Sequence, residues 1–205
     1  MLDSQGFDRW IREYDPAVAR SDRDGCYPFA GYAKLLDRIC TLVVSRGRPA
    51  VLDLGFGTAT LTARLYQSGC EIWGQDFSEG MRRLAQEKMP GAHLYGGDFS
   101  EGLAAPLRQQ SYDFIVATYA LHHLTDAGKL QLIRSVRGLL KNDGALLVGD
   151  VAFASRADMD RCRVQAGEAW DAEEHYFVAD ELKQALPDIV FEPVSFCGGL
   201  LTLKR

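Results

Sequence analysis

Apolar residues recur along this chain at two alternating spacings, one typical of helices and the other of strands. Residues 31–45 place apolar side chains three and four positions apart, which predicts an amphipathic helix. Residues 50–54 form the short apolar run typical of a buried parallel strand. The same alternation continues, with strands expected at 71–75, 92–95, 112–119 and 145–153, and helices at 58–67, at 78–88 and from 125 onward.

The pattern changes in the last third of the chain. Residues 155–186 have a helical pattern, in one or two pieces. Two apolar strands follow at 189–196 and 200–205, joined by a short glycine-containing turn at 197–199. Because so tight a turn cannot join parallel strands, the last strand is expected to run antiparallel in a hairpin.

Strands that alternate with helices predict a parallel sheet covered by helices on both faces. The predicted fold class is therefore α/β: a doubly wound, seven-stranded, mostly parallel sheet with one antiparallel strand in a C-terminal hairpin. Ser78 and Thr125 are the expected N-caps of two of its helices. Residues 31–205 would form this single domain, and residues 1–30 would form an N-terminal cap or lid.

Composition and charge narrow the class of protein. Of the 205 residues, 47% are hydrophobic and 25% are charged, as in ordinary globular proteins, and the formal net charge is -5. An acidic chain repels phosphate backbones on average, which disfavours a nucleic-acid partner. No apolar run approaches the ~20 residues of a membrane-spanning helix, and the N-terminus does not resemble a signal peptide. We therefore expect neither a membrane partner nor export.

The cysteines and histidines argue against two common kinds of site. The chain has five cysteines, an odd number with no close pair, so reduced thiols in a cytoplasmic protein are more consistent than disulfides. Among the four histidines, His122 and His123 are adjacent and the other two lie far away in the sequence. No metal site is expected from this arrangement.

The most informative segment is the glycine-containing turn after the first strand. Residues 51–61 read VLDLGFGTATL, so Gly55 and Gly57 follow an apolar run and a helix begins near Thr58. Glycines there allow the backbone to approach a ligand closely, and a helix N-terminus offers free N–H groups at the same place. This arrangement predicts a ligand site at the carboxyl end of the strand.

Two further acidic residues follow neighbouring strands. Asp76 lies 21 residues after Gly55, where a carboxylate can accept hydrogen bonds from both hydroxyls of a ribose. Asp98 ends the third strand and could accept a hydrogen bond from an exocyclic amine, while Phe99 could pack on a purine ring. A simple turn cap is the alternative role for Asp98, and core packing is the alternative for Phe99. Together these residues predict an adenosine pocket.

The kind of adenosine cofactor follows from what surrounds the glycines. The third glycine of the dinucleotide pattern is missing, because Thr60 occupies that position. Asp53 precedes the glycines by two residues, where its charge would repel a pyrophosphate but suits an ammonium group. Asp53 could act on that group directly, through water, or by ordering the loop.

Several spaced segments resemble class I S-adenosylmethionine-dependent methyltransferases, and most similar are small stand-alone bacterial members. The first motif is 51–61, and the opening segment 7–15 resembles the start of such proteins. One departure is Ala59, which replaces the third glycine and disfavours a positive φ. The other segments that carry the resemblance are 74–81, 96–99, 112–124 and 139–150.

The resemblance implies a set of cofactor-binding residues. Tyr14 would form a lid over the methionine carboxylate, with plain aromatic packing as its alternative. Thr118 and Tyr119 would contact the methionine end through their backbone. Core packing is the alternative for Phe77 and Met81. The full set implied is Tyr14, Asp53, Leu54, Gly55, Gly57, Thr58, Asp76, Phe77, Met81, Asp98, Phe99, Thr118 and Tyr119.

The resemblance also places His122 near the site of methyl transfer. An imidazole titrates near neutral pH, so His122 is the candidate catalytic proton acceptor. The alternatives are that the histidine pair shapes the loop after the fourth strand or orients the substrate. The candidate substrate-binding residues are Tyr27, Tyr32, His123 and Tyr176.

The function implied is transfer of the methyl group of S-adenosylmethionine to a small-molecule acceptor by direct in-line displacement, with S-adenosylhomocysteine as the product. The short acidic chain favours a small acceptor over a protein or a nucleic acid such as tRNA. Two alternatives are a nicotinamide-dependent oxidoreductase and a non-catalytic, cofactor-binding regulatory protein of the same fold. The sequence indicates neither the acceptor atom nor an oligomeric state.

Overall fold

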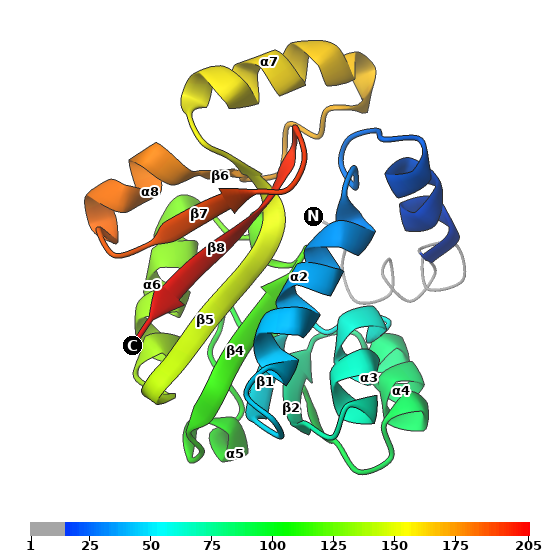
Figure 1. The fold of residues 1–205 in the computed structure, drawn as a ribbon, viewed down its shortest axis with the longest axis vertical. Coiled ribbons are helices and arrows are strands. Elements are labelled where there is room, and N and C mark those ends of the chain that lie inside the picture. Colours follow the sequence, from blue (N-terminus) through cyan, green and yellow to red (C-terminus); the bar gives the residue numbers. More distant parts are fainter. Residues whose placement is uncertain (1–14) are drawn as a thin grey trace.

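A computed structural model describes residues 15–205 of the protein (Figure 1). Within this range, eight strands form one sheet, and helices lie on both of its faces. The strands are β1 (Ala50–Leu54), β2 (Glu71–Asp76), β3 (His93–Gly96), β4 (Tyr112–Thr118), β5 (Leu140–Phe153), β6 (Phe177–Val178), β7 (Val190–Pro193) and β8 (Gly198–Lys204).

The strand order confirms the predicted doubly wound sheet. Seven strands run in the order β3-β2-β1-β4-β5-β8-β7, and β6 pairs with the end of β5. The pairs from β3 through β5 are parallel, whereas β8 is antiparallel to both β5 and β7, as the hairpin predicted. The eighth strand, β6, was not predicted because two residues are too few to show a period.

The glycines at the hairpin have a different role from the predicted one. Gly198 and Gly199 begin β8, and the chain reverses before them. A Cβ on Gly199 would clash with the ring of Phe191. These glycines therefore let two strands pack closely, and the reversal itself uses the preceding residues, where the Ser195 hydroxyl accepts from the N–H of Gly198 at 2.9 Å.

The helices begin and end close to the predicted positions. Ser78 and Thr125 are N-caps, and their hydroxyls accept from the N–H groups of Met81 and Gly128. Residues 15–23 are also helical. The other helices are α2 (Tyr32–Val44), α3 (Thr60–Gln67), α4 (Glu79–Lys88), the unpredicted α5 (Ala105–Arg108), α6 (Asp126–Arg137), α7 (Arg156–Ala166), α8 (Ala179–Ala185) and two 3-10 turns, η1 (Leu121–His123) and η2 (Gly167–Ala169).

Two hydrophobic cores hold the helices to the sheet. One core joins α2, α3 and α4 to one face, and the other joins α5, α6 and α8 to the opposite face. On α2, Leu35 and Ile39 are completely buried, and each such side chain contributes about 2 kcal/mol of burial free energy. Gly149 of β5 lets this helix approach, because a Cβ there would lie 2.9 Å from Cδ1 of Ile39.

Of the one or two helical pieces predicted over 155–186, the structure has two, α7 and α8. Residues 170–176 form an irregular segment between η2 and β6. Here the Asp171 carboxylate accepts from the N–H of Glu173 at 2.9 Å, and the N–H of His175 donates to the carbonyl oxygen of His122 at 2.8 Å. Contacts with a distant segment thus replace the helical hydrogen bonds, which no local pattern could indicate.

The described part of the N-terminal region is tied to the rest of the molecule. The Asp22 carboxylate accepts from the N–H groups of Gly31 and Ala33 at the start of α2. The Thr58 hydroxyl donates to the Asp15 carboxylate at 2.8 Å. The division into a 1–30 cap and a 31–205 domain stays a prediction. No helix among residues 15–205 is both long and apolar enough to span a bilayer.

Candidate active site

The turn between β1 and α3 contains three residues with left-handed backbone. Gly55 has a φ of 75°, Gly57 of 52° and Ala59 of 61°. A Cβ on Gly55 would lie 2.7 Å from the Cβ of Ala120, so this position requires glycine. Ala59 adopts the left-handed conformation despite a cost of roughly 1–2 kcal/mol. Ala59, which replaces the family's third glycine, therefore adopts the left-handed backbone that a glycine adopts readily.

Asp76, at the end of β2, holds this turn in place. Its Oδ2 accepts from the N–H of Gly57 at 2.8 Å, and its Oδ1 accepts from the N–H of Ser78 at 2.9 Å. The Lys88 ammonium fixes the same turn from another side, since it donates to the carbonyl oxygen of Thr58 at 2.6 Å. The buried Asp76 carboxylate lines a cavity at the carboxyl ends of the strands, where parallel α/β sheets bind ligands.

Asp53 lies behind the turn and does not line the cavity. Its Oδ2 accepts from the Thr62 hydroxyl, whereas its Oδ1 accepts a hydrogen bond from none of the described residues. Complete burial raises the pKa of Asp53 to about 7, the Thr62 hydroxyl lowers it, and the charge of Asp76 raises it further. Of the roles predicted for Asp53, this position is consistent with ordering the loop.

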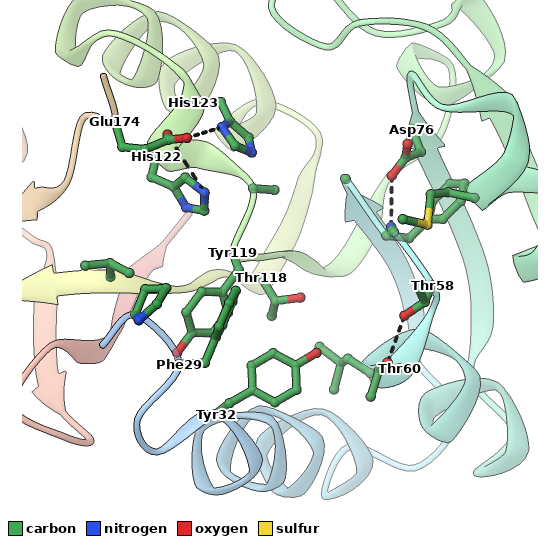
Figure 2. A pocket seen from close by; sticks show the side chains of 18 of the residues that line it. Phe29, Tyr32, Thr58, Thr60, Asp76, Thr118, Tyr119, His122, His123 and Glu174 are labelled. Carbon is green, nitrogen blue, oxygen red and sulfur yellow. Dashed lines mark hydrogen bonds and ion pairs between the residues drawn. The ribbon is translucent and has the colours of Figure 1, made fainter. Parts of the chain in front are cut away.

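The cavity has a volume of about 330 Å³, and the predicted residues lie at both of its ends (Figure 2). Asp76 and the glycine turn lie on one side, and His122 and His123 lie on the other. Thr118 and Tyr119, at the end of β4, lie between them. We call the first group the glycine end; it consists of Gly55, Gly57, Thr58, Asp76, Phe77, Met81 and Phe99.

Besides Asp53, two predicted cofactor residues, Asp98 and Leu54, do not line the cavity. Asp98 is exposed, and its Oδ1 accepts from the N–H of Ser100 at 2.7 Å, so it caps a turn. This is the alternative role considered for it, and the adenine contact stays a prediction. Leu54 is completely buried in the core beneath the turn. Tyr14 lies outside the described residues.

The opposite side of the cavity is aromatic and acidic, and we call it the histidine end. It consists of Tyr27, His122, His123, Glu174 and Tyr176. The hydroxyl groups of Tyr27 and Tyr176 are hydrogen bonded to each other, and burial raises the pKa of both. These two tyrosines therefore stay neutral at physiological pH and form a wall of the cavity.

The remaining predicted substrate residue, Tyr32, lies where the two ends meet. Its ring lies 5.2 Å from that of Tyr119, and Phe29 lies 5.0 Å from the same ring. Tyr119 has a φ of 48°, which is rare for an aromatic residue and often marks a functional position. Tyr32 is thus shared between the two ends, not confined to the substrate.

Asp150 holds His122 in one orientation. Its Oδ1 lies 2.6 Å from Nδ1 of His122, and its oxygens also accept from the N–H groups of Leu121 and Val151. Burial opposes ionisation of Asp150, but His122 and the Val151 N–H hold its pKa below the usual value. Burial would lower the pKa of His122, but the charges of Asp150 and Glu174 raise it. Because Asp150 occupies Nδ1, Nε2 is the ring nitrogen of His122 that is available to a molecule in the cavity.

Glu174 connects the two histidines. Its Oε1 lies 3.0 Å from Nδ1 of His123, and its Oε2 lies 3.9 Å from Nε2 of His122. Burial raises the pKa of Glu174, but the hydrogen bond from His123 and the nearby imidazole of His122 lower it below the usual value. The cavity therefore has an ionised carboxylate at its histidine end.

Sequence reasoning assigned no site role to several residues that the structure places here. Asp150 stands in an apolar strand, where a charged residue was a signal that could have been used. Glu174 lies within residues 155–186, for which only a helical pattern was predicted. The other cavity residues without a predicted role are Pro28, Phe29, Phe56, Thr60, Leu61, Ala120, Val151, Ala169 and Asp171.

The glycine end fits S-adenosylmethionine on physical grounds. Asp76 presents a buried carboxylate that can accept from ribose hydroxyls, and the backbone of Gly55 and Gly57 lines the same end of the cavity. Phe77 and Met81 supply apolar surface for an adenine ring. No lysine or arginine is present among the described lining residues, which argues against a pyrophosphate.

Comparisons with known proteins agree with this site. A family described as a methyltransferase domain matches residues 51–144. An uncharacterized methyltransferase of Geobacillus thermodenitrificans is 36% identical over 178 residues, which cover 87% of this chain and 78% of that protein. An uncharacterized methyltransferase of Alkaliphilus oremlandii is 32% identical over 152 residues, covering 74% of this chain and 68% of the relative.

Solved structures share the fold. DhpI in complex with S-adenosylhomocysteine has a TM-score of 0.71 at 16% identity, covering 98% of this chain and 93% of DhpI. The magnesium protoporphyrin IX methyltransferase of Synechocystis, also with bound S-adenosylhomocysteine, has a TM-score of 0.68 at 20% identity. The match covers 98% of this chain and 94% of that methyltransferase. The chain therefore belongs to the class I S-adenosylmethionine-dependent methyltransferases, and S-adenosylmethionine is its cofactor.

Proposed function

We propose that the protein methylates a small molecule that binds at the histidine end of the cavity. The observation that carries this proposal is that one continuous cavity joins the glycine end to Tyr27, Tyr176 and the histidine pair. A volume of about 330 Å³ matches the lower part of the range for small-molecule sites. The net charge of -5 supports a small acceptor over a nucleic acid.

The residues of the glycine end would hold the cofactor. Asp76 would accept from the ribose hydroxyls, and the N–H groups of the turn between β1 and α3 would face the rest of the ligand. Phe77, Met81 and Phe99 would enclose the adenine. Bound S-adenosylmethionine supplies a methyl group on a positively charged sulfur, which an attacking lone pair can take directly.

His122 is the proposed catalytic residue. Because Asp150 holds its Nδ1, its ring is fixed and the lone pair of Nε2 is left for the cavity. That nitrogen is the group at the histidine end best suited to activate the attacking atom of the acceptor. His123 and Tyr176 would contact the rest of the acceptor, and Tyr32 would position it against Tyr119.

The aromatic walls would keep water away from the reacting atoms, which leaves alignment as the main task of the protein. The five cysteines form no disulfide within the described residues, which suits a reducing compartment. We include a cytoplasmic location in the proposal on that basis.

The test combines calorimetry with a screen of small hydroxyl, amine and thiol acceptors followed by formation of S-adenosylhomocysteine. With an acceptor that is turned over, His122→Ala should lower turnover by about 100-fold or more. Its affinity for S-adenosylmethionine should stay within about twofold of the wild type, since His122 lies away from the glycine end.

Unchanged turnover in His122→Ala would assign the histidine a structural role. Binding of S-adenosylmethionine without turnover of any acceptor would instead favour a non-catalytic, cofactor-binding protein. His93→Ala is a matched control, because His93 stacks on Trp73 outside the cavity at 4.1 Å between ring centroids.

A further inference from the structure

Three side chains at the histidine end converge on one point of the cavity wall. His122, His123 and Glu174 each present one ligand atom, and all three atoms lie within 4.8 Å of one another. Figure 2 shows the three side chains together on the side of the pocket opposite Asp76. Two imidazoles and one carboxylate form a donor set that binds divalent transition metals and leaves coordination positions open.

The first imidazole is already held as metal-binding histidines usually are. The carboxylate of Asp150 accepts from the Nδ1 side of His122 at 2.6 Å and is itself held by two backbone N–H groups. A carboxylate behind the ring fixes the tautomer and leaves Nε2 as a lone-pair donor. Asp150 is completely buried, and among the described residues His122 is the imidazole with which it forms a hydrogen bond.

The carboxylate of the set has an unused oxygen. Glu174 Oε2 is buried, and it accepts a hydrogen bond from none of the described residues. Its nearest charged neighbour is Nε2 of His122 at 3.9 Å, which is too long for a hydrogen bond. A buried carboxylate oxygen without a hydrogen bond is costly, and a cation between it and the two imidazoles would offset that cost.

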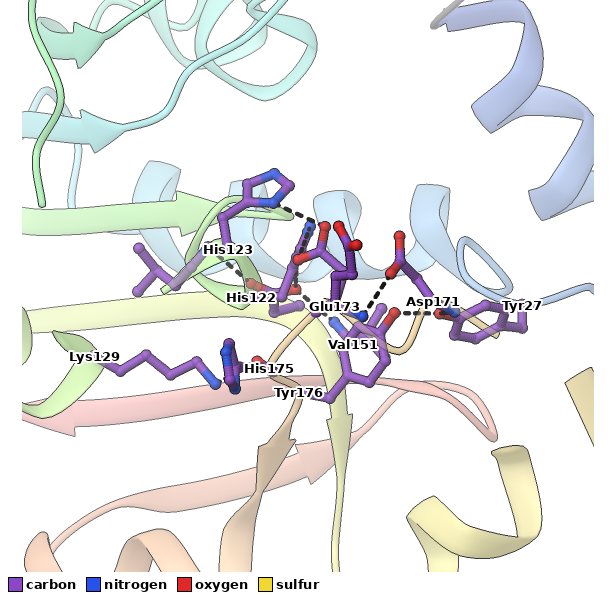
Figure 3. Close-up of polar contacts among 12 residues, drawn as sticks. Tyr27, His122, His123, Lys129, Val151, Asp171, Glu173, His175 and Tyr176 are labelled. Atoms are coloured by element: carbon purple, nitrogen blue, oxygen red, sulfur yellow. Dashed lines mark hydrogen bonds and ion pairs between the residues drawn. The ribbon is translucent and has the colours of Figure 1, made fainter. Parts of the chain in front are cut away.

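The backbone around the three ligands is braced on both sides (Figure 3). The N–H of His175 donates to the carbonyl oxygen of His122 at 2.8 Å, which ties the 170–176 segment to η1. The buried ammonium of Lys129 donates to the carbonyl oxygen of His175 and to Asp126. Glu174 is therefore held beside a histidine pair that lies 51 residues earlier in the chain.

We propose that His122, His123 and Glu174 bind one divalent first-row transition metal ion such as Zn²⁺. Two ligands at right angles around a metal, each about 2.1 Å from it, lie about 3.0 Å apart. Glu174 Oε1 lies 3.0 Å from Nδ1 of His123, which equals that value, and its second oxygen, Oε2, lies 3.9 Å from Nε2 of His122, so each imidazole has a carboxylate oxygen within the span of two ligands of one ion. The sequence analysis predicted no metal site, but that prediction rested on the histidines and cysteines alone and did not include Glu174.

This inference rests on the proposed function and specifies how His122 activates the acceptor. A hydroxyl oxygen of the acceptor would occupy an open coordination position, and the ion would lower the pKa of that hydroxyl. The proton would pass to solvent water, and the oxygen would keep the electron pair that forms the new bond to the methyl group. The bond between that methyl group and the sulfonium sulfur would break, and its electron pair would stay on the sulfur of the departing S-adenosylhomocysteine. The acceptor class implied is a small molecule with a hydroxyl group.

The test begins with metal binding, independent of activity. Untagged protein is freed of metal with a chelator and titrated calorimetrically with Zn²⁺. We expect one ion per chain, with affinity at least tenfold lower in Glu174→Gln and in His123→Ala. Glu168→Gln and His175→Ala are matched controls with exposed side chains, and both should bind like the wild type.

Absence of stoichiometric binding, or equal affinity in Glu174→Gln and wild type, would overturn the metal site. Circular dichroism and titration with S-adenosylmethionine, expected to be unchanged in each variant, verify that the protein is folded. Co²⁺ provides a second readout, since its visible spectrum should show nitrogen and oxygen coordination in the wild type and change in His123→Ala.

Turnover then separates this inference from the proposed function. With an acceptor in hand, chelation should abolish methylation and Zn²⁺ should restore it. Full turnover by metal-free protein would reject the metal and leave His122 as a direct proton acceptor. Metal binding without methylation of any hydroxyl acceptor would reject the proposed function while the site itself stands.

Discussion

The two ends of the cavity are built in different ways. The glycine end comes from a turn and from the ends of neighbouring strands, where Asp76 directly holds the N–H of Gly57. The histidine end is assembled from segments far apart in the chain, with Glu174 meeting the pair at 122–123. The glycine end is thus specified by local backbone geometry, whereas the proposed acceptor site depends on long-range packing.

The largest expected effect distinguishes Asp76 from Asp98, two acidic residues that the sequence analysis assigned to the same adenosine pocket. Asp76→Ala removes the ribose acceptor and the anchor of Gly57, so affinity for S-adenosylmethionine should fall by about 100-fold or more. Asp98→Ala should change it by less than about twofold, because Asp98 caps an exposed turn. Calorimetry measures both, and an equal loss in the two variants would support the predicted adenine contact.

The second effect concerns pH and the buried carboxyl of Asp53. Its pKa of about 7 in the folded protein exceeds the ~3.9 of an unfolded chain, so its contribution to stability is present at acid pH and is lost as pH rises toward 7. The groups that act on it are Thr62, Asp76 and Tyr32. Asp53→Asn removes the titration.

From pH 5 to pH 8, the cofactor-free wild type should lose roughly 3 kcal/mol of unfolding free energy relative to Asp53→Asn. Urea denaturation at both pH values measures this difference. Parallel pH profiles for the two proteins would show that Asp53 is ionised throughout the range.

The third effect concerns the two glycines of the turn at the glycine end. Gly55→Ala should lower the unfolding free energy by about 2–3 kcal/mol, because its Cβ would meet Ala120 at 2.7 Å in a strained conformation. Gly57→Ala should cost only about 1 kcal/mol, since a Cβ there has no described atom within 4 Å. Urea denaturation measures both losses of unfolding free energy. Equal losses in the two variants would mean that backbone strain alone accounts for the cost.

The smallest effect concerns the residue that departs from the family. Ala59→Gly should relieve left-handed strain and stabilise the protein by up to about 1 kcal/mol, partly offset by the entropy of glycine. Thermal unfolding measures the change, and affinity for S-adenosylmethionine should be unaltered. A destabilised variant would indicate that the buried methyl group of Ala59 outweighs the strain.

The parts of the molecule that could be predicted are those with a local cause. Ser78 and Thr125 cap helices because a side-chain oxygen reaches an N–H three residues on, and the glycine turn follows from positive φ values. Residues 170–176 lack such a cause, because a contact with the distant His122 sets their course between the two predicted helical pieces. Asp150 and Glu174 were not assigned because their roles depend on partners that only the folded chain brings near.

The irregular 170–176 segment has an evolutionary consequence. It contributes Asp171, Glu174 and Tyr176 to the cavity but none of the residues of the glycine end. If the histidine end binds the acceptor as proposed, substitutions in this one stretch alter which molecule is methylated while use of the cofactor is inherited unchanged. A scaffold arranged in this way allows new specificities to arise by a few changes in a surface connection.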